Sequence, residues 1–363
     1  MYKILASILI SLIVSFNVYA QEFPKCSFWK GVNSYDDCIA EHEYEEGLYI
    51  GLFKNGVPNG EGKWQGKNGL IYNGEFLDFK FNGSGTLESK VNKYKYVGEF
   101  LDSKLHGQGI FTWDNGDRYV GEFKNDKRDG LGQFFWIDGS SYVGTFKNNE
   151  IHGKGKRVFK DGTTYQGEYK NNLKHGQGTL IFFDPKTKVI GEFINDEFHK
   201  GTIIYNDGDK YIGKVIKGKK NGKGEYIWSN GNKYIGEYKD DERTGKGKFI
   251  SFKGFTYEGD FLNGKFNGEG TYFFNNDSEG EKYIGEFKNG NFHGVGTFYW
   301  KSGDKYEGEY KNDKREGMGK ITWVSGASSF GSFKDGKRHG THEYKYADGS
   351  IKKILYNNGE EIE

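Results

Sequence analysis

One phrase recurs thirteen times between Tyr49 and Tyr344, and its regular spacing restricts the fold more than any other feature of the chain. Each copy has an aromatic-x-Gly-x-aromatic step, a polar turn and a Gly-x-Gly step, and residues 96–111 are the clearest example. The copies begin at residues 49, 72, 96, 119, 142, 165, 189, 211, 234, 257, 283, 306 and 329. So regular a period predicts a repeat array in which each unit packs on its neighbours, rather than a globular enzyme.

Composition agrees with an ordered array. Glycine accounts for 57 of 363 residues and the mean hydropathy is -0.82, values that taken alone would favour disorder. Aromatic residues, however, make up 17% of the chain and stand in register, whereas disordered segments lack such large apolar groups. Charge is balanced, with 52 Lys and Arg against 51 Asp and Glu, which argues against general attraction to nucleic acid or anionic lipid.

Side-chain alternation predicts the fold class. Along a strand Tyr96, Gly98 and Phe100 share one face, and Val97 and Glu99 share the other. Asn-Gly and Asp-Gly steps between copies are typical of tight turns. We therefore expect an all-β protein, an elongated single-layer antiparallel meander of about thirteen β-hairpin repeats over residues 49–346. Residues 21–48 and 347–363 are expected to form short N- and C-terminal caps.

Glycine weakens a strand unless something uses the space that it leaves. A glycine between two rings, or opposite a ring on the neighbouring strand, lets that ring lie across bare backbone. Ladders of such aromatic contacts would hold together a sheet that has no second layer, since each cross-strand contact contributes about 0.2 to 1 kcal/mol.

The phrase resembles the MORN repeat: tyrosine-x-glycine-glutamate-phenylalanine, then asparagine and lysine, then histidine-glycine-x-glycine, at a period of 23 residues. The resemblance covers about 295 residues. It implies rod-like or curved hairpin sheets with roles in binding and scaffolding, sometimes at membranes. It implies no activity by itself, because catalysis in that family comes from attached domains.

Several copies depart from the phrase, including the eighth, which has Val215 in place of its second aromatic residue. The seventh begins with Val189, has Lys200 in place of its second glycine and is one residue short before Gly201. The tenth has an enlarged turn at residues 275–281, and the last begins at Ser329 and has His342 at its third glycine. We expect a local change of twist or a break at the seventh copy.

The N-terminus carries the signals of export. Residues 1–20 combine Lys3, an apolar run and small residues at the cleavage position, which predicts a secretory signal peptide; an uncleaved anchor is the alternative. Cys26 and Cys38 are the only cysteines, and in an exported chain they predict a disulfide. Two free thiols or half of a metal site are the alternatives. The expected location is secreted or periplasmic.

The aromatic-and-glycine face is the first candidate binding surface, because recognition energy tends to concentrate on exposed aromatic residues. Its candidate residues are Tyr96, Phe100, Tyr119, Phe123, Tyr142, Phe146, Tyr165 and Tyr169. If these rings pack against one another, the opposite face, which carries Glu99, Glu122, Glu168 and Glu192, becomes the candidate.

No catalytic, cofactor or metal site is expected. Six histidines share one repeat position, but neighbouring repeats are about 9 to 10 Å apart, too far for ligands of one zinc ion; a weak pH-sensing role stays open. Residues 275–280 with Glu286 resemble a calcium loop, yet Glu286 already belongs to the repeat phrase. The Gly-x-Gly steps open no helix, so they are not phosphate loops.

The sequence therefore predicts an exported, non-enzymatic protein that binds or scaffolds protein partners. Peripheral binding to a membrane lipid or an envelope glycan is the alternative, and an enzyme whose site is assembled from scattered residues is a third reading. No nucleic-acid partner is expected. Homodimerisation through the C-terminal end is a hypothesis that follows from an open sheet edge.

Overall fold

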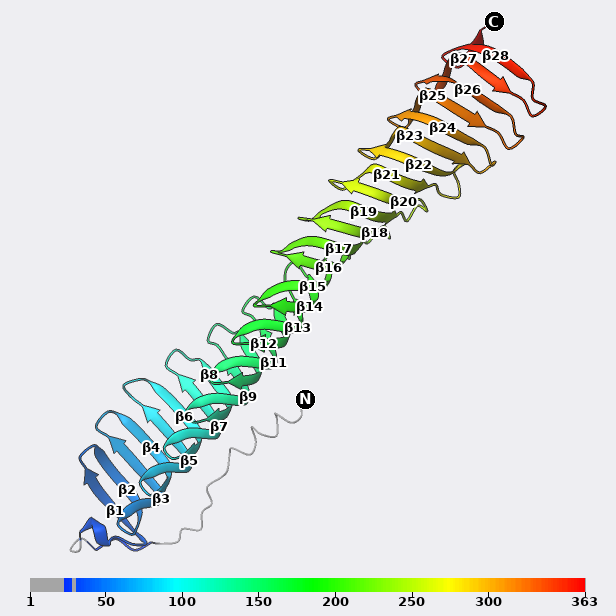
Figure 1. Ribbon diagram of the computed structural model, residues 1–363. Helices are drawn as coiled ribbons and strands as arrows, with labels where there is room; N and C mark the ends of the chain where they lie inside the picture. Colours follow the sequence, from blue (N-terminus) through cyan, green and yellow to red (C-terminus); the bar gives the residue numbers. More distant parts are fainter. Residues whose placement is uncertain (1–22, 28–30, 363) are drawn as a thin grey trace. The chain divides into compact units, whose positions relative to one another are not determined.

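The computed structural model describes residues 23–27 and 31–362, so the expected signal peptide lies outside the described residues. The described chain is built from antiparallel strands, and its one helical element is a short 3-10 turn, η2 (Val32–Ser34). The predicted all-β hairpin meander is confirmed. Each strand pairs with the strands before and after it in the sequence, as Figure 1 shows for the successive hairpins.

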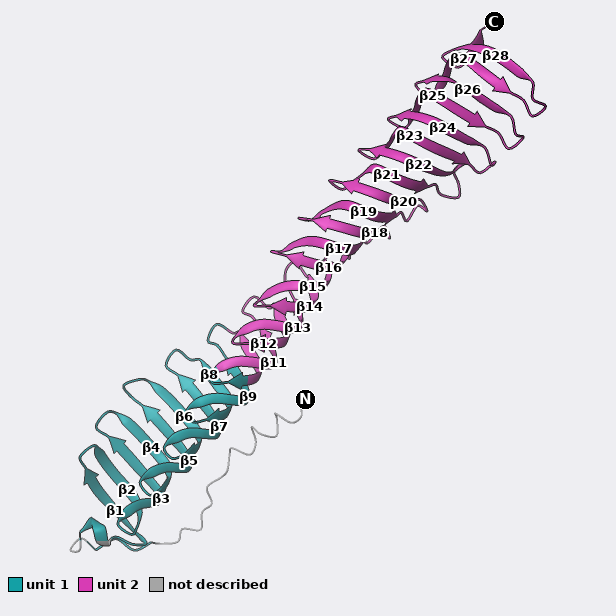
Figure 2. Cartoon of the chain, in the orientation of Figure 1, with its two compact units in different colours: residues 1–138, 146–149 teal, residues 139–145, 150–363 magenta. Residues whose placement is uncertain are grey.

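The chain divides into two compact units, coloured separately in Figure 2. The first ends at Asp138 and also contains Phe146–Asn149, and the second contains Gly139–Thr145 and everything from Glu150 onward. Strands β1 to β9 lie in the first unit and β11 to β29 in the second, while β10 contributes residues to both.

The strands of the first unit, with β10, have the following bounds: β1 Cys38–Tyr44, β2 Gly47–Lys54, β3 Val57–Gly66, β4 Leu70–Leu77, β5 Lys80–Ser89, β6 Tyr94–Leu101, β7 Lys104–Trp113, β8 Arg118–Lys124, β9 Lys127–Phe135 and β10 Ser141–Lys147. In the second unit they are β11 Glu150–Val158, β12 Thr164–Lys170, β13 Leu173–Ile181, β14 Lys188–Ile194, β15 Glu197–Ile204, β16 Lys210–Ile216, β17 Lys219–Ile227, β18 Lys233–Lys239, β19 Glu242–Ile250, β20 Thr256–Leu262, β21 Lys265–Phe273, β22 Gly280–Lys288, β23 Asn291–Trp300, β24 Lys305–Lys311, β25 Lys314–Thr322, β26 Ser328–Lys334, β27 Lys337–Lys345, β28 Ile351–Asn357 and β29 Glu360–Ile362.

The hairpin turns are made by residues that tolerate the left-handed backbone region. Asn125 and Asp126, between β8 and β9, both have positive φ, as a type I′ turn requires. The Asp126 carboxylate also accepts the backbone N–H of Leu105 in the preceding repeat, at 2.9 Å. The same residue therefore closes its own hairpin and ties it to its neighbour.

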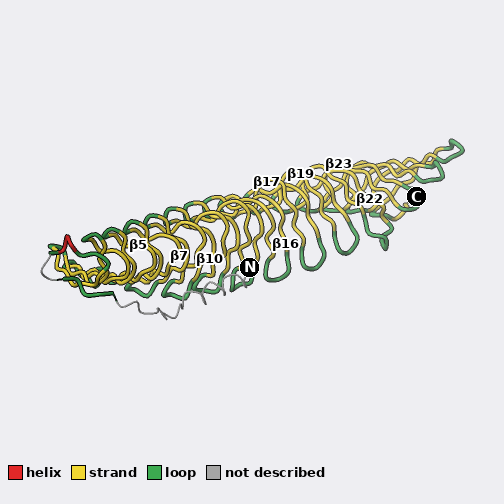
Figure 3. Tube along the Cα trace, turned by 90° about the horizontal axis from the view of Figure 1, so that it is seen from below, coloured by secondary structure: helices red, strands yellow, loops and turns green. Residues whose placement is uncertain are grey.

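A β-bulge follows the glycine pair in each regular hairpin. Gly98 pairs with Gly109, but Glu99 pairs with His106, so Gly107 and Gln108 have no partner across the hairpin. Gly107 has a φ of 55°, and a Cβ there would lie 2.4 Å from the Glu99 carboxylate. That carboxylate accepts the N–H of Gln108 at 2.8 Å. The bulge bends the strand, and Figure 3 shows β5 and β7 as curved strands.

The core is a row of tyrosines that lie on glycine backbone. A Cβ added to Gly109 would lie 2.3 Å from the Tyr96 ring, so only glycine leaves room for that ring. The Tyr96 hydroxyl donates to the Glu99 carbonyl at 2.9 Å. Its ring makes edge-to-face contacts with Phe100 in the same repeat and with Phe123 in the next. This arrangement confirms the interpretation of the glycines as space for rings.

A residue of the second strand covers the other side of each tyrosine ring. Phe266 stacks on Tyr257, with centroids 3.9 Å apart. In other repeats the same position holds a cation, such as Arg243, whose guanidinium carbon lies 5.5 Å from the centre of the Tyr234 ring. Each tyrosine is therefore enclosed between backbone on one side and a stacked side chain on the other.

The seventh repeat, β14 and β15, lacks this arrangement. Gly191 pairs with Gly201, but Val189 stands where the tyrosine would be, and the backbone atoms of the facing strand are the nearest neighbours of a Cβ at either glycine. Glu192 pairs with Lys200 and Phe193 with Phe198, so the bulge contains one unpaired residue instead of two. The missing residue before Gly201 is thus absorbed in the bulge.

The last repeat, β26 and β27, also has a ring on glycine backbone, but here the ring comes from the second strand and the glycine from the first. Ser329 replaces the tyrosine, and the fully buried His342 replaces a glycine on the partner strand. The imidazole lies against Gly331, where a Cβ would be 2.5 Å from the ring. Its Nε2 donates to the Ser332 carbonyl at 2.7 Å, which is the bond that the tyrosine hydroxyl makes elsewhere.

The N-terminal end of the array is covered by a short crossing segment. Cys26 and Cys38 form a disulfide, as expected. The backbone N–H of Cys26 donates to the Ile39 carbonyl, and Lys25 pairs with Ile39 in a parallel bridge. These contacts occupy part of the outer edge of β1.

Candidate binding surfaces

The eight aromatic residues expected to form an open surface are buried. Each is at most 5% exposed: Tyr96, Phe100, Tyr119, Phe123, Tyr142, Phe146, Tyr165 and Tyr169. They are packed into edge-to-face contacts that continue from repeat to repeat within each unit. The expectation of a binding surface at these positions was therefore wrong, because the glycines that create the space are filled by the rings of the protein itself.

Burial also changes the ionisation of the ladder tyrosines. It raises the pKa of Tyr234 and of Tyr306 to about 12, and that of Tyr96 beyond the usual range of a phenol. In each case desolvation is the largest cause, because the phenolate would lose its hydration. These hydroxyls are structural donors rather than acids or nucleophiles.

The glutamates of the opposite face have a structural role as well. The carboxylates of Glu99 and Glu122 accept the bulge N–H groups of Gln108 and Leu131, at 2.8 and 3.1 Å. A Cβ on Gly176 would lie 2.3 Å from the Glu168 carboxylate, which places that glutamate over its own bulge. Glu192, in the irregular seventh repeat, pairs across the hairpin with Lys200.

This opposite face is hollowed in the second unit. A groove of about 980 Å³ extends over the central residues of β16 to β22. Its apolar contacts come from Ile212, Ile235 and Ile284, and the last two are each 42% exposed. Glycine backbone lies between them, because the glycine pairs have no side chain on either face.

Charged residues of both signs line the groove and its margins. Lys233 pairs with Glu225 at 2.7 Å, Lys246 with Asp260 at 2.8 Å and Lys248 with Glu258 at 3.3 Å. Such exposed pairs contribute little to stability. The lining residues of the groove include three lysines and four glutamates, a mixture that suits a partner of mixed charge better than a polyanion.

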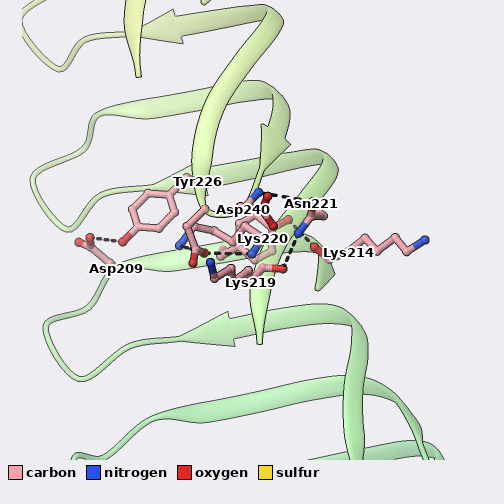
Figure 4. A network of polar contacts seen from close by, with 9 residues as sticks. Asp209, Lys214, Lys219, Lys220, Asn221, Tyr226 and Asp240 are labelled. Carbon is pink, nitrogen blue, oxygen red and sulfur yellow. Dashed lines mark hydrogen bonds and ion pairs between the residues drawn. The ribbon is translucent and has the colours of Figure 1, made fainter. Parts of the chain in front are cut away.

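A polar network lies on the ladder side of the eighth repeat (Figure 4). The Tyr226 hydroxyl donates to Asp209 at 2.6 Å, and this bond lowers the pKa of the Asp209 carboxyl. Lys220 binds Asp241 at 3.1 Å, and its ammonium lies 5.6 Å from the centre of the Tyr226 ring. Lys220 stands at the position that covers the ladder tyrosine, and its ammonium lies 5.8 Å from the centre of the Tyr211 ring.

No metal site is found within the described residues, where no cluster of three or more His, Cys, Asp or Glu side chains could hold an ion. The calcium-like segment is folded as a turn in which Ser278 donates to the Asn275 carbonyl. Glu286 accepts the bulge N–H of Val295, as the repeat phrase predicts. Over the same described part of the chain, no helix has the length and apolarity needed to cross a membrane.

The fold defines a tandem β-hairpin repeat protein whose units are held together by tyrosine on glycine. The family model of the MORN repeat matches eleven segments, which together make up more than half of the chain, and the chain belongs to this family. The segments are residues 49–71, 96–118, 119–141, 142–164, 165–184, 211–233, 234–255, 257–279, 283–305, 306–328 and 330–351. The copies that begin at residues 72 and 189 lie outside them.

No curated protein matches the chain. Among solved structures, the G-box domain of the microcephaly protein CPAP is 11% identical with a TM-score of 0.20, over 63% of this chain and 100% of that one. The SAS-4 TCP domain of Drosophila melanogaster, in complex with a proline-rich motif of Ana2, is 12% identical with a TM-score of 0.23, over 55% and 90%. At these TM-scores neither likeness carries an argument about this chain.

Proposed function

We propose that this chain is a non-enzymatic scaffold that binds an extended segment of a protein partner in the groove over β16 to β22. The observation that supports the proposal is the groove itself, in which exposed isoleucines alternate with bare glycine backbone. MORN repeats are commonly protein-binding or membrane-binding modules. The ladder rings themselves are buried, so they are not the surface proposed for this partner.

An extended segment suits the groove for two reasons. Ile212 and Ile235 stand at the same position of successive repeats, so they offer apolar contacts about 9 to 10 Å apart. This matches one turn of an extended polyproline II segment, which brings residues i and i+3 to the same side about 9 Å apart. The paired charges on the margins are exposed and can exchange their partners for the charges of a bound segment without leaving a buried ion.

Photocrosslinking tests this proposal. A photoreactive phenylalanine derivative placed at Ile235 should crosslink a discrete partner in the native compartment, and the same group at Leu262, which is 52% exposed and is not a groove residue, should not. The double substitution Ile212→Glu and Ile235→Glu should abolish binding of the partner so identified. Equal crosslinking from both positions, or binding that survives the double substitution, would contradict the proposal.

Export is part of the proposed function. The Cys26–Cys38 disulfide is typical of oxidising compartments, which supports the expected periplasmic or secreted location. The cysteine pair of protein recovered from its source should resist alkylation until a reductant is added. Alkylation without reductant would contradict export.

The C-terminal edge supports a second proposal, pairing with another copy of the chain. β28 is covered by β29 only at Leu355 to Asn357, so the rest of its outer edge has no strand partner within the described residues. Ile351 on this strand is 60% exposed. Light scattering should report a dimer that Ile351→Pro converts to a monomer, because proline blocks strand addition.

Membrane binding is the alternative that family membership favours. The balanced charge of the chain argues against anionic lipid. Sedimentation with vesicles that contain phosphatidylserine, at low salt, distinguishes membrane binding from protein binding in the groove. Vesicle binding that persists in the Ile212→Glu and Ile235→Glu double variant would favour the membrane.

A further inference from the structure

A cavity of about 450 Å³ lies between Trp300 and Trp323 in the second unit, at the turns that join successive repeats. The two tryptophans occupy the same position in repeats eleven and twelve and lie two strands apart, about 9 to 10 Å. Both are half-buried, and Ile321, which also lines the cavity, is buried. Within the described residues, neither indole N–H has a hydrogen-bond acceptor.

The enlarged turn of the tenth repeat supplies a third wall. Its Glu279 lines the cavity, and its backbone carbonyl accepts the N–H of Lys301 at 3.0 Å. The Lys301 ammonium also donates to the carbonyls of Asn275 and Asn276. The residues added to this repeat are therefore fixed against the turn that carries Trp300, and they close a space that a turn of ordinary length would leave open.

The charged groups around the cavity narrow the class of ligand. Glu279 and Asp304 would repel an anion, whereas Arg315 and Lys301 would repel a cation. The two cations are already engaged, since Arg315 donates to the Gly336 carbonyl at 2.8 Å and Lys301 to the enlarged turn. Asp304 accepts the backbone N–H of Val324 at 2.9 Å through Oδ1, which leaves Oδ2 for a ligand. The Glu279 side chain is exposed and has no partner among the described residues, so its carboxylate is available to accept a hydroxyl of a ligand.

We propose that this cavity binds a neutral oligosaccharide. The apolar face of a pyranose ring packs against an indole, and its hydroxyls donate to the carboxylates of Glu279 and Asp304, while each indole N–H donates to a ring or hydroxyl oxygen. The separation of the two tryptophans corresponds to about two sugar residues along the array. This site is separate from the groove over β16 to β22, and the proposal does not rest on partner binding there.

Trp228 provides a matched control. It holds the same repeat position as Trp300, but the next repeat has Ser251 there in place of a second tryptophan. Its ring is covered in part by Arg243, at 5.5 Å. Loss of Trp228 should disturb packing in the way that loss of Trp300 does, without removing a wall of the cavity.

Titration calorimetry of the intact protein with cellotriose, maltotriose and triacetylchitotriose tests the proposal, with choline as the cationic comparison. At least one trisaccharide should bind in the millimolar range or more tightly. Trp300→Leu and Trp323→Leu should each weaken that binding about tenfold or more, and Trp228→Leu should not change it. Glu279→Gln should weaken binding without lowering the melting temperature, because no structural bond of that carboxylate is lost.

Three results would overturn the proposal. In the first, none of the three sugars binds. In the second, choline binds and no sugar does. In the third, Trp228→Leu weakens sugar binding as much as Trp300→Leu does. Melting curves of each variant show whether the array is still folded, and Glu279→Gln keeps the test decisive if a tryptophan variant unfolds.

Discussion

The seventh and the last repeat both lack the ladder tyrosine, and they solve the same problem differently. In the last repeat His342 enters from the partner strand, lies against Gly331 and donates to the Ser332 carbonyl. In the seventh, Val189 leaves the pair of Gly191 and Gly201 without a ring. In most repeats a ring therefore covers the glycine pair, and either strand of the hairpin can contribute that ring. In the seventh repeat no ring covers the pair.

Removing a ladder ring should have the largest effect. Tyr234→Ala deletes a ring that contacts both Tyr238 and Phe261, and a large-to-small change of this kind costs about 3 to 5 kcal/mol. Val189→Ala should cost clearly less, because no ring is lost. Hydrogen exchange of the flanking strands measures both, and equal losses of protection would contradict the distinction between the repeats.

The exchange of roles in the last repeat predicts a compensating pair. His342→Gly alone should destabilise the repeat by leaving a cavity, and Ser329→Tyr alone should overpack it, each by about 1 to 3 kcal/mol. Together they rebuild the ordinary arrangement, so the double variant should be more stable than either single one. A double-mutant cycle checks this, and strict additivity would show that the two positions do not share one space.

Supplying the missing ring should have a smaller effect of the opposite sign. Val189→Tyr places a ring over Gly191 and Gly201, with Phe193 and Val215 as neighbours in the row. One edge-to-face contact is worth about 0.5 to 1.5 kcal/mol beyond burial, so a modest rise in local protection is expected. A decrease would mean that the shorter bulge leaves no room for the ring.

The last repeat should also lose stability at acidic pH, and this loss should be smaller than the effects of the substitutions above. Desolvation lowers the pKa of His342, the Ser332 carbonyl opposes that shift, and Arg338 adds to it; Tyr356 packs against the ring. A histidine kept neutral by folding stabilises the fold above its unfolded pKa, near 6.5, and this contribution falls as the pH drops from there toward the folded pKa. Exchange rates in β27 should rise from pH 7 to pH 5 after correction for intrinsic rates, and they should not rise in this way in His342→Gln.

The sequence predicted the fold because its period, its glycines and its turn residues act locally. It did not predict which face is open, because that depends on how completely Tyr96 and Phe123 fill the space that glycine leaves. Side-chain alternation alone cannot distinguish a ring exposed on a single-layer sheet from one enclosed between glycine backbone and a residue such as Arg243. Only the structure shows that a Cβ on these glycines would collide with the tyrosine rings.

The candidate sites were partly foreseeable. The enlarged turn at residues 275–281 stood out as a departure from the repeat, but its contact with Trp300 and Lys301 depends on the pairing of strands distant in the sequence. Ile212 and Ile235 carry a signal that could have been used, since an apolar residue in Tyr-x-Gly faces away from the ladder.

The enclosed tyrosine ladder holds the repeats together. Titration of the tyrosines by near-ultraviolet absorbance measures that enclosure. Ladder tyrosines such as Tyr234 and Tyr306 should stay protonated until about pH 12 or until the protein unfolds, because burial raises their pKa. A single transition near pH 10 in folded protein would show that the rings are accessible, and it would contradict the claim.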